Sequence, residues 1–246
     1  MLDQLIFYFL LLTCVGSLFS YGCVKPQAVG PRFFQYHGGG FLLFTLLAFY
    51  FKPMGFAGET RWLALAAIAG VALSSGLLRQ MSATSLSGAI ALYSGLRYLD
   101  GGLAGPQILN LLMVALMLGF SMTAMWLGHW YLTQPKLSID ELKRITVWMI
   151  ALLALRIVLA LYFTWPRLPS DEVALYRFFA TSTGIFILMR VSWGLLMPAA
   201  LLWMVWKTVA IRSTQSATGI LYVLLLSVLA GEVLSLYLMF HDAWIL

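Results

Sequence analysis

Apolar residues occur in long runs along this chain, and short polar segments separate the runs. Seven of the runs are strongly apolar and one is weaker. A helix needs about 20 mostly apolar residues to cross the hydrocarbon core of a bilayer. The runs are near this length, so the pattern predicts an all-α polytopic integral membrane protein with a bundle of eight transmembrane helices.

The predicted helices form one domain, residues 1–246, with no loop of domain size. They are Leu5–Cys23, Phe33–Phe51, Trp62–Leu78, Thr84–Leu99, Gln107–Leu132, Ile145–Trp165, Phe178–Trp206 and Ala217–Phe240. The fourth is short and partly polar, and the bundle has seven helices if this segment does not span. Ser87, Ala91 and Gly95 recur there at every fourth residue, which gives the segment a small-residue face for close helix packing.

Composition excludes a water-soluble globule and argues against a nucleic-acid-binding protein. Hydrophobic residues make up 62% of the chain, charged residues 10%, and the mean hydropathy is +0.91, which leaves too little polar surface to face water. The net charge is +6, but the cations are scattered between apolar runs, where they act as orientation signals. The lipid bilayer is therefore the expected partner.

No motif for soluble enzyme chemistry is found. The sequence contains no P-loop, no G-x-G-x-x-G, no H-E-x-x-H, no C-x-x-C and no G-x-S-x-G. Cys14 and Cys23 lie in one apolar run, away from any histidine, so they predict buried thiols and no metal site. The sequence leaves open whether the protein is an enzyme.

The distribution of cations between the loops predicts the orientation of the bundle. Loops 1–2, 3–4, 5–6 and 7–8 hold eight cations, namely Lys25, Arg32, Arg79, Lys136, Lys143, Arg144, Lys207 and Arg212. The other face holds five, namely Lys52, Arg61, Arg97, Arg167 and Arg177. Cytoplasmic loops are enriched in lysine and arginine, so both termini are expected outside the cytoplasm.

Three charged residues, Arg156, Arg190 and Glu232, lie deep within predicted spans. From the cytoplasmic helix ends, Arg190 lies at about 24 Å and Glu232 at about 22 Å, whereas Arg156 lies at about 16 Å. Arg190 and Glu232 are therefore expected to meet, and Arg156 is expected one to two turns away without a carboxylate. A charge at such depth normally faces the bundle interior and has a partner or a function.

Two roles remain open for these charges. In the first, Arg190 and Glu232 form a structural ion pair between two helices. In the second, the three residues are catalytic: Arg156 contacts an anionic or carbonyl-bearing ligand, and Glu232 exchanges protons. With one arginine paired to the acid, Arg190→Leu should be more damaging to the structure than Glu232→Gln, because a neutral amide still forms hydrogen bonds.

A second candidate site consists of His37 and His129. In the eight-helix topology, each lies about one turn from the cytoplasmic end of its helix, so the two imidazoles are expected at similar depth. Neutral imidazole is a common haem ligand, and Gly38, Gly39 and Gly40 remove side chains where a flat macrocycle or quinone ring needs space. The alternative is a pair of histidines bound to backbone or lipid headgroups. A seven-helix topology would separate the two.

The last predicted helix has a short family resemblance. Gly231-Glu232, followed by Tyr237-Leu238-Met239-Phe240, resembles the quinol-oxidising membrane anchors of dimethyl sulfoxide reductase-like enzymes, which also have eight helices with both termini outside. The arginine expected after the Gly-Glu pair is absent, since Leu234 to Leu238 contains no cation. The resemblance implies a quinol-linked role, and no site residue is transferred from it.

Together these features favour a subunit of an electron-transfer complex in the bacterial inner membrane. It is expected to bind quinone, haem b or both within the bundle, with His37 and His129 as the cofactor-binding residues, and to assemble with other membrane subunits. A small secondary transporter is the main alternative, although no inverted repeat or pair of broken helices is evident. A ligand-free structural or assembly subunit is the third reading.

Overall fold

In a computed structural model, the chain is helical over nearly all of the residues that the structure describes, which are 2–51, 105–134 and 137–246. The helices are α1 (Leu2–Tyr21), α2 (Pro26–Val29), α3 (Pro31–Tyr50), α6 (Gly105–Thr133), α7 (Asp140–Thr164), the 3₁₀ turn η1 (Trp165–Arg167), α8 (Glu172–Phe179), α9 (Ser182–Val191), the π-helical turn η2 (Ser192–Leu196), α10 (Met197–Ala210) and α11 (Thr214–Asp242). Within these ranges no strand occurs, in agreement with the predicted all-α class.

Five helices in the described ranges are long and apolar enough to cross a membrane. They are α1, α6, α7 extended by η1, the continuous helix Ser182–Ala210, and α11. These correspond to the first, fifth, sixth, seventh and eighth predicted spans. α3 matches the second predicted span in position, but its first turns carry Arg32, Gln35 and His37 and are less apolar. The predicted helices Trp62–Leu78 and Thr84–Leu99 lie outside the described residues.

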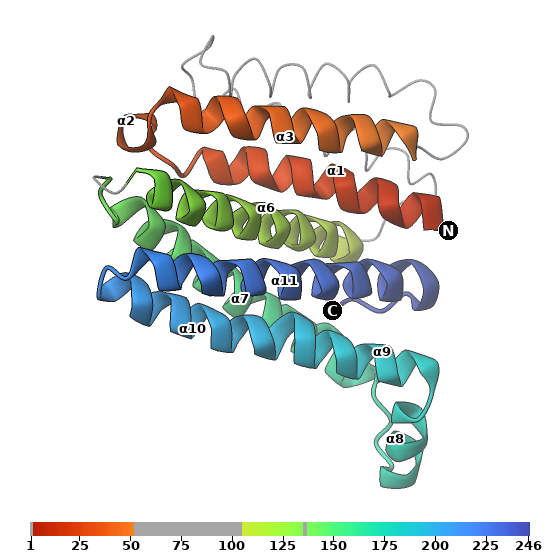
Figure 1. Cartoon of the computed structure of the whole chain (residues 1–246). Helices are drawn as coiled ribbons and strands as arrows, with labels where there is room; N and C mark the ends of the chain where they lie inside the picture. The colour runs from red at the N-terminus through yellow and green to blue at the C-terminus, as the bar shows by residue number, and fades with distance from the viewer. Residues whose placement is uncertain (1, 52–104, 135–136) are drawn as a thin grey trace.

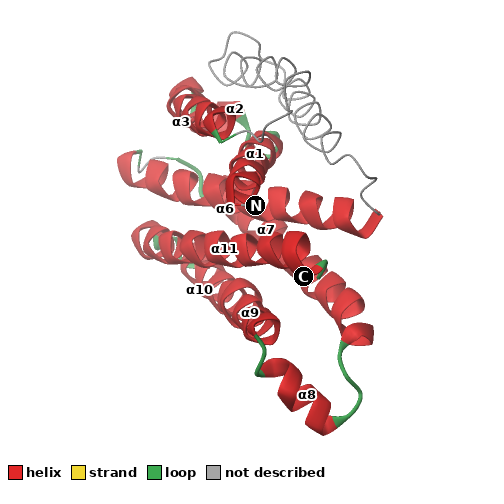
Figure 2. Ribbon diagram, turned by 90° about the vertical axis from the view of Figure 1, so that its right-hand side faces the viewer, coloured by secondary structure: helices red, strands yellow, loops and turns green. Residues whose placement is uncertain are grey.

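The predicted start of the seventh span, Phe178, is wrong. α8 ends at Phe179, and a new helix begins at Ser182, where the Thr181 hydroxyl accepts a hydrogen bond from the Gly184 amide at 3.1 Å. α8 projects sideways from the bundle (Figures 1 and 2). Hydropathy could not reveal this break, because the last residues of α8, Phe178 and Phe179, are as apolar as a membrane span.

Ser138-Ile139-Asp140-Glu141 has the spacing of a capping box at the start of α7, but no capping box forms. The Ser138 hydroxyl bonds to the Asp140 carboxylate at 2.5 Å, and Ile139 precedes the helix without a side-chain cap. Glu141 instead accepts the Lys25 amide at 3.0 Å and pairs with Arg144. The carboxylate therefore joins α7 to the turn after α1 and does not cap its own helix.

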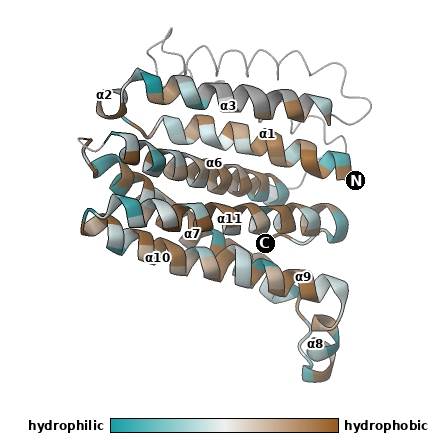
Figure 3. Ribbon diagram, in the orientation of Figure 1, coloured by the Kyte–Doolittle hydropathy of each residue, from teal (hydrophilic) through white to brown (hydrophobic). Residues whose placement is uncertain are grey.

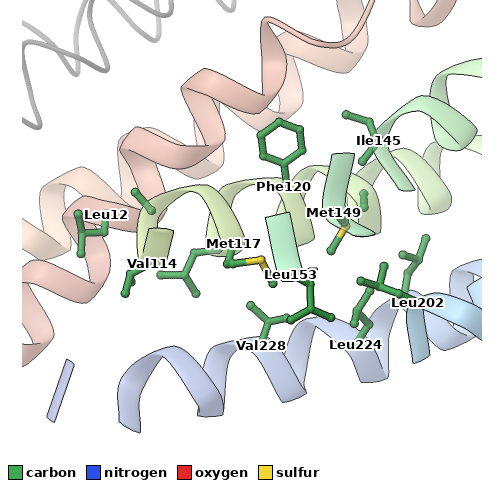
Figure 4. Close-up of a cluster of buried hydrophobic side chains, with 14 of the residues drawn as sticks. Leu12, Val114, Met117, Phe120, Ile145, Met149, Leu153, Leu202, Leu224 and Val228 are labelled. Carbon is green, nitrogen blue, oxygen red and sulfur yellow. The ribbon is translucent and has the colours of Figure 1, made fainter. Parts of the chain in front are cut away.

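α6 is the central helix of the described bundle, and 16 of its 29 residues are buried. It packs against α1 on one side and α11 on the other (Figure 1). Side chains from these helices and from α7 and α10 interdigitate in one apolar core, which includes Met117, Leu153, Leu202 and Val228 (Figure 4). The outward faces of α7 and α10 are apolar and exposed, as expected for helices in contact with lipid (Figure 3).

Small residues allow α1 and α6 to cross at very short range. A Cβ atom added to Gly16 or Gly119 would lie closer than 3.0 Å to the backbone of the facing helix. Beside this crossing, the Ser20 hydroxyl contacts the Thr123 hydroxyl at 2.5 Å and donates to the Gly119 carbonyl at 3.1 Å. Association of helices in lipid depends on such close packing and interhelical hydrogen bonds.

The connections that carry most predicted cytoplasmic cations lie together at one end of the bundle. The turn after α1, the α6–α7 connection and the α10–α11 connection share this end, whereas the amino terminus and the start of α9 lie at the opposite end (Figure 1). This arrangement agrees with the loop sets used to predict orientation.

The orientation itself yields a prediction. In a chain whose Cys14 and Cys23 are replaced by alanine, a cysteine at Lys143 should react with an impermeant thiol reagent only from the cytoplasmic side, because positively charged loops are retained there. Reporter fusions at both termini should report an extracytoplasmic location. Labelling of Lys143→Cys by the impermeant reagent in intact cells would show that the bundle has the opposite orientation.

Candidate functional site

Arg156, Arg190 and Glu232 form one ion-pair triad inside the bundle. Arg156 Nη2 lies 2.9 Å from Glu232 Oε2, and Arg190 Nη2 lies 3.0 Å from Glu232 Oε1, so each carboxylate oxygen is bound by a different arginine. The exposed fractions of the three residues are 2%, 0% and 1%. The predicted contact between Arg190 and Glu232 is confirmed.

The prediction that Arg156 lacks a carboxylate is wrong. Parallel helices would place Arg156 one to two turns away from the pair. However, α7 crosses behind α6 and α11 at an oblique angle (Figure 1). The crossing brings Arg156 to the level of the pair, and the long arginine side chain covers the remaining distance. Glu232 therefore binds two guanidinium groups and not one.

Asn110 and Ser235 complete the surroundings of Arg156. Arg156 Nη1 donates to Asn110 Oδ1 at 2.7 Å, and its Nη2 donates to the Ser235 hydroxyl at 2.8 Å. Asn110 Nδ2 in turn donates to the sulfur of Met239 at 3.2 Å. Glu232, Ser235 and Met239 recur at i, i+3 and i+7 and so share one face of α11. This face meets the first turns of α6 and the middle of α7.

Asn110 was not predicted as a site residue, although the sequence contained a signal for it. Asn110 is the single asparagine of the chain, and it lies in an apolar helix, where an amide normally marks an interhelical contact. Ser235 follows Glu232 by one helical turn, which is a weaker signal because serine is frequent in membrane helices.

A π-helical turn positions Arg190. Two residues after Arg190, η2 begins and replaces one α-helical turn, and π-helical turns leave backbone carbonyls without their usual partners. Arg190 Nη1 donates to the Gly194 carbonyl at 3.1 Å, and the Ser227 hydroxyl of α11 donates to the Trp193 carbonyl. Arg190 therefore satisfies its own helix backbone with one nitrogen and binds Glu232 with the other.

Two facing glycines provide room for the Arg190 guanidinium. Gly194 of η2 and Gly231 of α11 lie against each other, and a Cβ atom on either would lie closer than 3.0 Å to Arg190 Nη1. The small pair brings the two helices together at the level of the triad. Larger residues at these positions would displace the guanidinium from Glu232.

The triad carries two positive charges and one negative charge. Among the residues that the structure describes, Glu232 has the sole acidic side chain that pairs with either arginine. The Nε–H groups of Arg156 and Arg190 are buried and have no hydrogen-bond partner in the same ranges. Arginine remains protonated in proteins, so the side chains of the triad have an excess of one positive charge and of hydrogen-bond donors.

A short segment after α11, Ala243–Leu246, contacts Ser235 and Arg190; we call it the strap. The Leu246 main-chain oxygen accepts the Ser235 hydroxyl at 2.5 Å and lies 3.5 Å from Arg190 Nη2. Ala243 turns the chain with a φ of 55°, and the Trp244 amide then donates to the Leu238 carbonyl at 3.0 Å. The strap thus returns along α11 toward the triad (Figure 1).

The second candidate site, the histidine site, lies at the opposite end of the bundle from the strap. The His37 ring of α3 stacks on Trp126 of α6 with centroids 4.3 Å apart and contacts the edge of Phe33 at 4.1 Å. His129 lies one turn after Trp126, and its Nδ1 is 3.2 Å from the Tyr222 hydroxyl of α11. The stacking on Trp126 places His37 about one helical turn from His129 along α6. The predicted common level of His37 and His129 is therefore confirmed.

The histidine site has one buried polar atom without a hydrogen bond of standard geometry. This atom is His37 Nδ1, and the main chain of Phe33, one turn earlier on α3, lies near the ring and can accept a hydrogen bond from it. The surrounding wall is aromatic, because Phe33 and Trp126 cover the His37 ring, and Trp130 lies against Phe33. A planar ligand with a hydrogen-bonding oxygen, or a metal that accepts an imidazole nitrogen, fits this donor set.

A groove of about 810 Å³ lies apart from both sites, at the end of α7 nearest η1. It is lined by Leu161, Tyr162, Phe163, Trp165 and Pro166 and by no ionisable group other than the Tyr162 phenol. Its side chains are those of a lipid-facing surface near the membrane interface.

Comparison of the chain with models of protein families, with curated protein sequences and with solved structures finds no match. Conclusions about function therefore depend on the two sites.

Proposed function

We propose that this chain is an integral membrane subunit of an electron-transfer complex in the bacterial inner membrane, and that it binds a quinone or haem b at the histidine site. The observation that carries the proposal is that the His37 ring of α3 stacks on Trp126 of α6, one turn before His129, so the two histidines lie at a similar level. Among the described residues His37 Nδ1 is buried without a hydrogen bond of standard geometry, which favours a ligand that supplies a better one than the nearby Phe33 main chain.

The chemistry of the histidine site suits either cofactor. A quinone carbonyl accepts a hydrogen bond from an imidazole N–H, and its flat ring stacks on aromatic side chains such as Trp126. Haem iron binds the neutral imidazole of histidine and would supply one-electron transfer when bound. The hydrogen bond between Tyr222 and His129 Nδ1 would fix the orientation of the His129 ring in both cases.

A ligand-free structural subunit is the second candidate, and the closed triad supports it. Arg156, Arg190 and Glu232 bind one another and are buried, so in this conformation their charged groups are not accessible to a substrate. Ion pairs and hydrogen bonds between helices hold bundles together in lipid. The same closure leaves a transporter without an open substrate site in this conformation.

The histidine proposal predicts the cofactor content of three variants. The purified parent should show a b-type band in its reduced-minus-oxidised spectrum or contain quinone by solvent extraction. His37→Ala and His129→Ala should each lose the cofactor while remaining in the membrane, because each removes one of the two imidazoles. His241→Ala is the matched control: it removes the third histidine, which lies at the other end of α11 and contacts Asp242.

A parent without either cofactor, or unchanged content in both site variants, would reject the histidine site. The structural-subunit reading would then be the better account of the chain.

A further inference from the structure

The strap differs from the other groups around the triad in how it is held. Asn110, Arg156, Arg190, Glu232 and Ser235 belong to long helices, whereas Leu246 follows a single turn after α11. That turn places Ala243 in the left-handed conformation, which is unfavourable for a residue with a Cβ atom. The strap is therefore the part of the described cluster that lies outside a helix.

Side-chain contacts hold the strap closed near the end of the bundle. Arg167 Nη1 donates to the Ala243 carbonyl at 2.6 Å, and the Arg167 guanidinium lies 4.4 Å from the centroid of the Trp244 ring. Phe178 also packs against the Trp244 ring, with ring centroids 5.7 Å apart. Trp244 is 8% exposed. These contacts come from η1 and α8, and Trp244 and Leu246 also belong to the buried apolar core.

The geometry of the strap shows what it covers. Ser235 lies seven residues before Asp242 on α11, a rise of about 10 Å, and three extended residues span about the same distance. Trp244, Ile245 and Leu246 therefore follow α11 from its end down to Ser235. Withdrawal of the strap would expose Ser235 and Arg190 from that end of the bundle and leave two donors without the oxygen that they contact.

We propose that the strap is a built-in occupant of an oxyanion site formed by Ser235 and Arg190, and that the site binds the carboxylate of a small molecule when the strap withdraws. The Leu246 oxygen stands where an oxygen of that carboxylate would bind. The bound carboxylate would balance the excess positive charge of the triad side chains. The inference is independent of the histidine site.

Accessibility of position 235 tests the strap. A cysteine is placed at Ser235 in a chain with Cys14 and Cys23 changed to alanine, with and without residues 243–246. We expect removal of the strap to accelerate thiol modification by a small anionic methanethiosulfonate about tenfold or more, and the anionic reagent to react faster than a cationic one of similar size. Trp244→Ala, which keeps the full main chain of the strap, should also accelerate modification, and the anionic reagent should again react faster than the cationic one.

Ligand binding is tested with acetate in chains that keep Ser235. Acetate should raise the unfolding temperature of the chain without the strap more than equimolar chloride does, and Ser235→Ala should remove the difference. The intact chain should respond weakly. The effect of acetate on the unfolding temperature should also be measured for His37→Ala in the chain without the strap. An unchanged response to acetate would separate this site from the histidine site.

Three results would overturn the proposal. The first is an equal modification rate with and without the strap, and the second is faster reaction of the cationic reagent. The third is loss of folded protein in both Trp244→Ala and the truncated chain, which would make the strap a structural part of the bundle.

Discussion

Glu232→Gln should be among the most destabilising single substitutions in the bundle. Glutamine leaves two guanidinium groups buried beside each other without a counter-charge, and removing one side of a buried ion pair costs about 3 to 5 kcal/mol. Arg156 and Arg190 bind the same carboxylate, so without its charge the two guanidinium groups repel each other. We expect a strongly lowered unfolding temperature in detergent or nanodiscs and reduced accumulation in the membrane.

Glu172→Gln provides the matched control, since it makes the same chemical change at an exposed position of α8. It should leave the unfolding temperature unchanged. Equal behaviour of the two variants would show that Glu232 does not stabilise the bundle.

The triad also reverses the order of effects that a simple ion pair predicts. Arg190→Leu leaves Glu232 paired with Arg156 at 2.9 Å and gives a neutral pair. Its cost comes from the lost hydrogen bond to Gly194 and imperfect packing, about 1 to 3 kcal/mol. Glu232→Gln should therefore be more damaging than Arg190→Leu, whereas the expectation from the sequence was the opposite.

Gly119→Ala should have a comparably large effect at the crossing of α1 and α6. The three atoms nearest to the added Cβ belong to the backbone of Gly16 and Ser17, so they cannot move aside unless the helices separate. Overpacking of this kind costs about 1 to 3 kcal/mol or more. Thermal unfolding should show the loss, and the Ser20–Thr123 contact should weaken with it.

Gly219→Ala is the control for this crossing, because it is the same substitution within α11 and no atom lies within 4 Å of the added Cβ. It should be neutral or slightly stabilising, since alanine favours helix more than glycine does. Similar losses in Gly119→Ala and Gly219→Ala would mean that helix separation is not the cause.

The sequence was most informative where one physical term dominates. Transfer of apolar residues into lipid selects long hydrophobic helices, so hydropathy located α1, α6, α7 and α11 within a few residues at most ends. It was uninformative at Phe178–Thr181, where an amphipathic helix, a turn and a span are all rich in apolar residues. There the Thr181 cap decides the boundary, and capping is a local hydrogen-bond effect.

The candidate sites were predictable in part for a similar reason. Burial of a charge in lipid is costly at any orientation, so Arg156, Arg190 and Glu232 were identifiable from position alone. Their partners depend on helix tilt and side-chain direction, which a linear depth scale does not contain. Asn110 became a partner of Arg156 because α7 crosses obliquely. The proximity of His37 and His129 followed from connectivity, which places both at the same end.

The π-helical turn at Ser192–Leu196 holds one more residue than an α-helical turn would. Each residue turns a helix by about 100°, so the extra one determines which side chains of α10 face lipid relative to those of α9. A relative that lacks the turn needs one residue fewer to keep both faces in place. An alignment of this chain with a relative that lacks the turn should therefore contain a single-residue gap between positions 192 and 196, and Arg190, whose guanidinium binds the Gly194 carbonyl of the turn, should vary together with that gap.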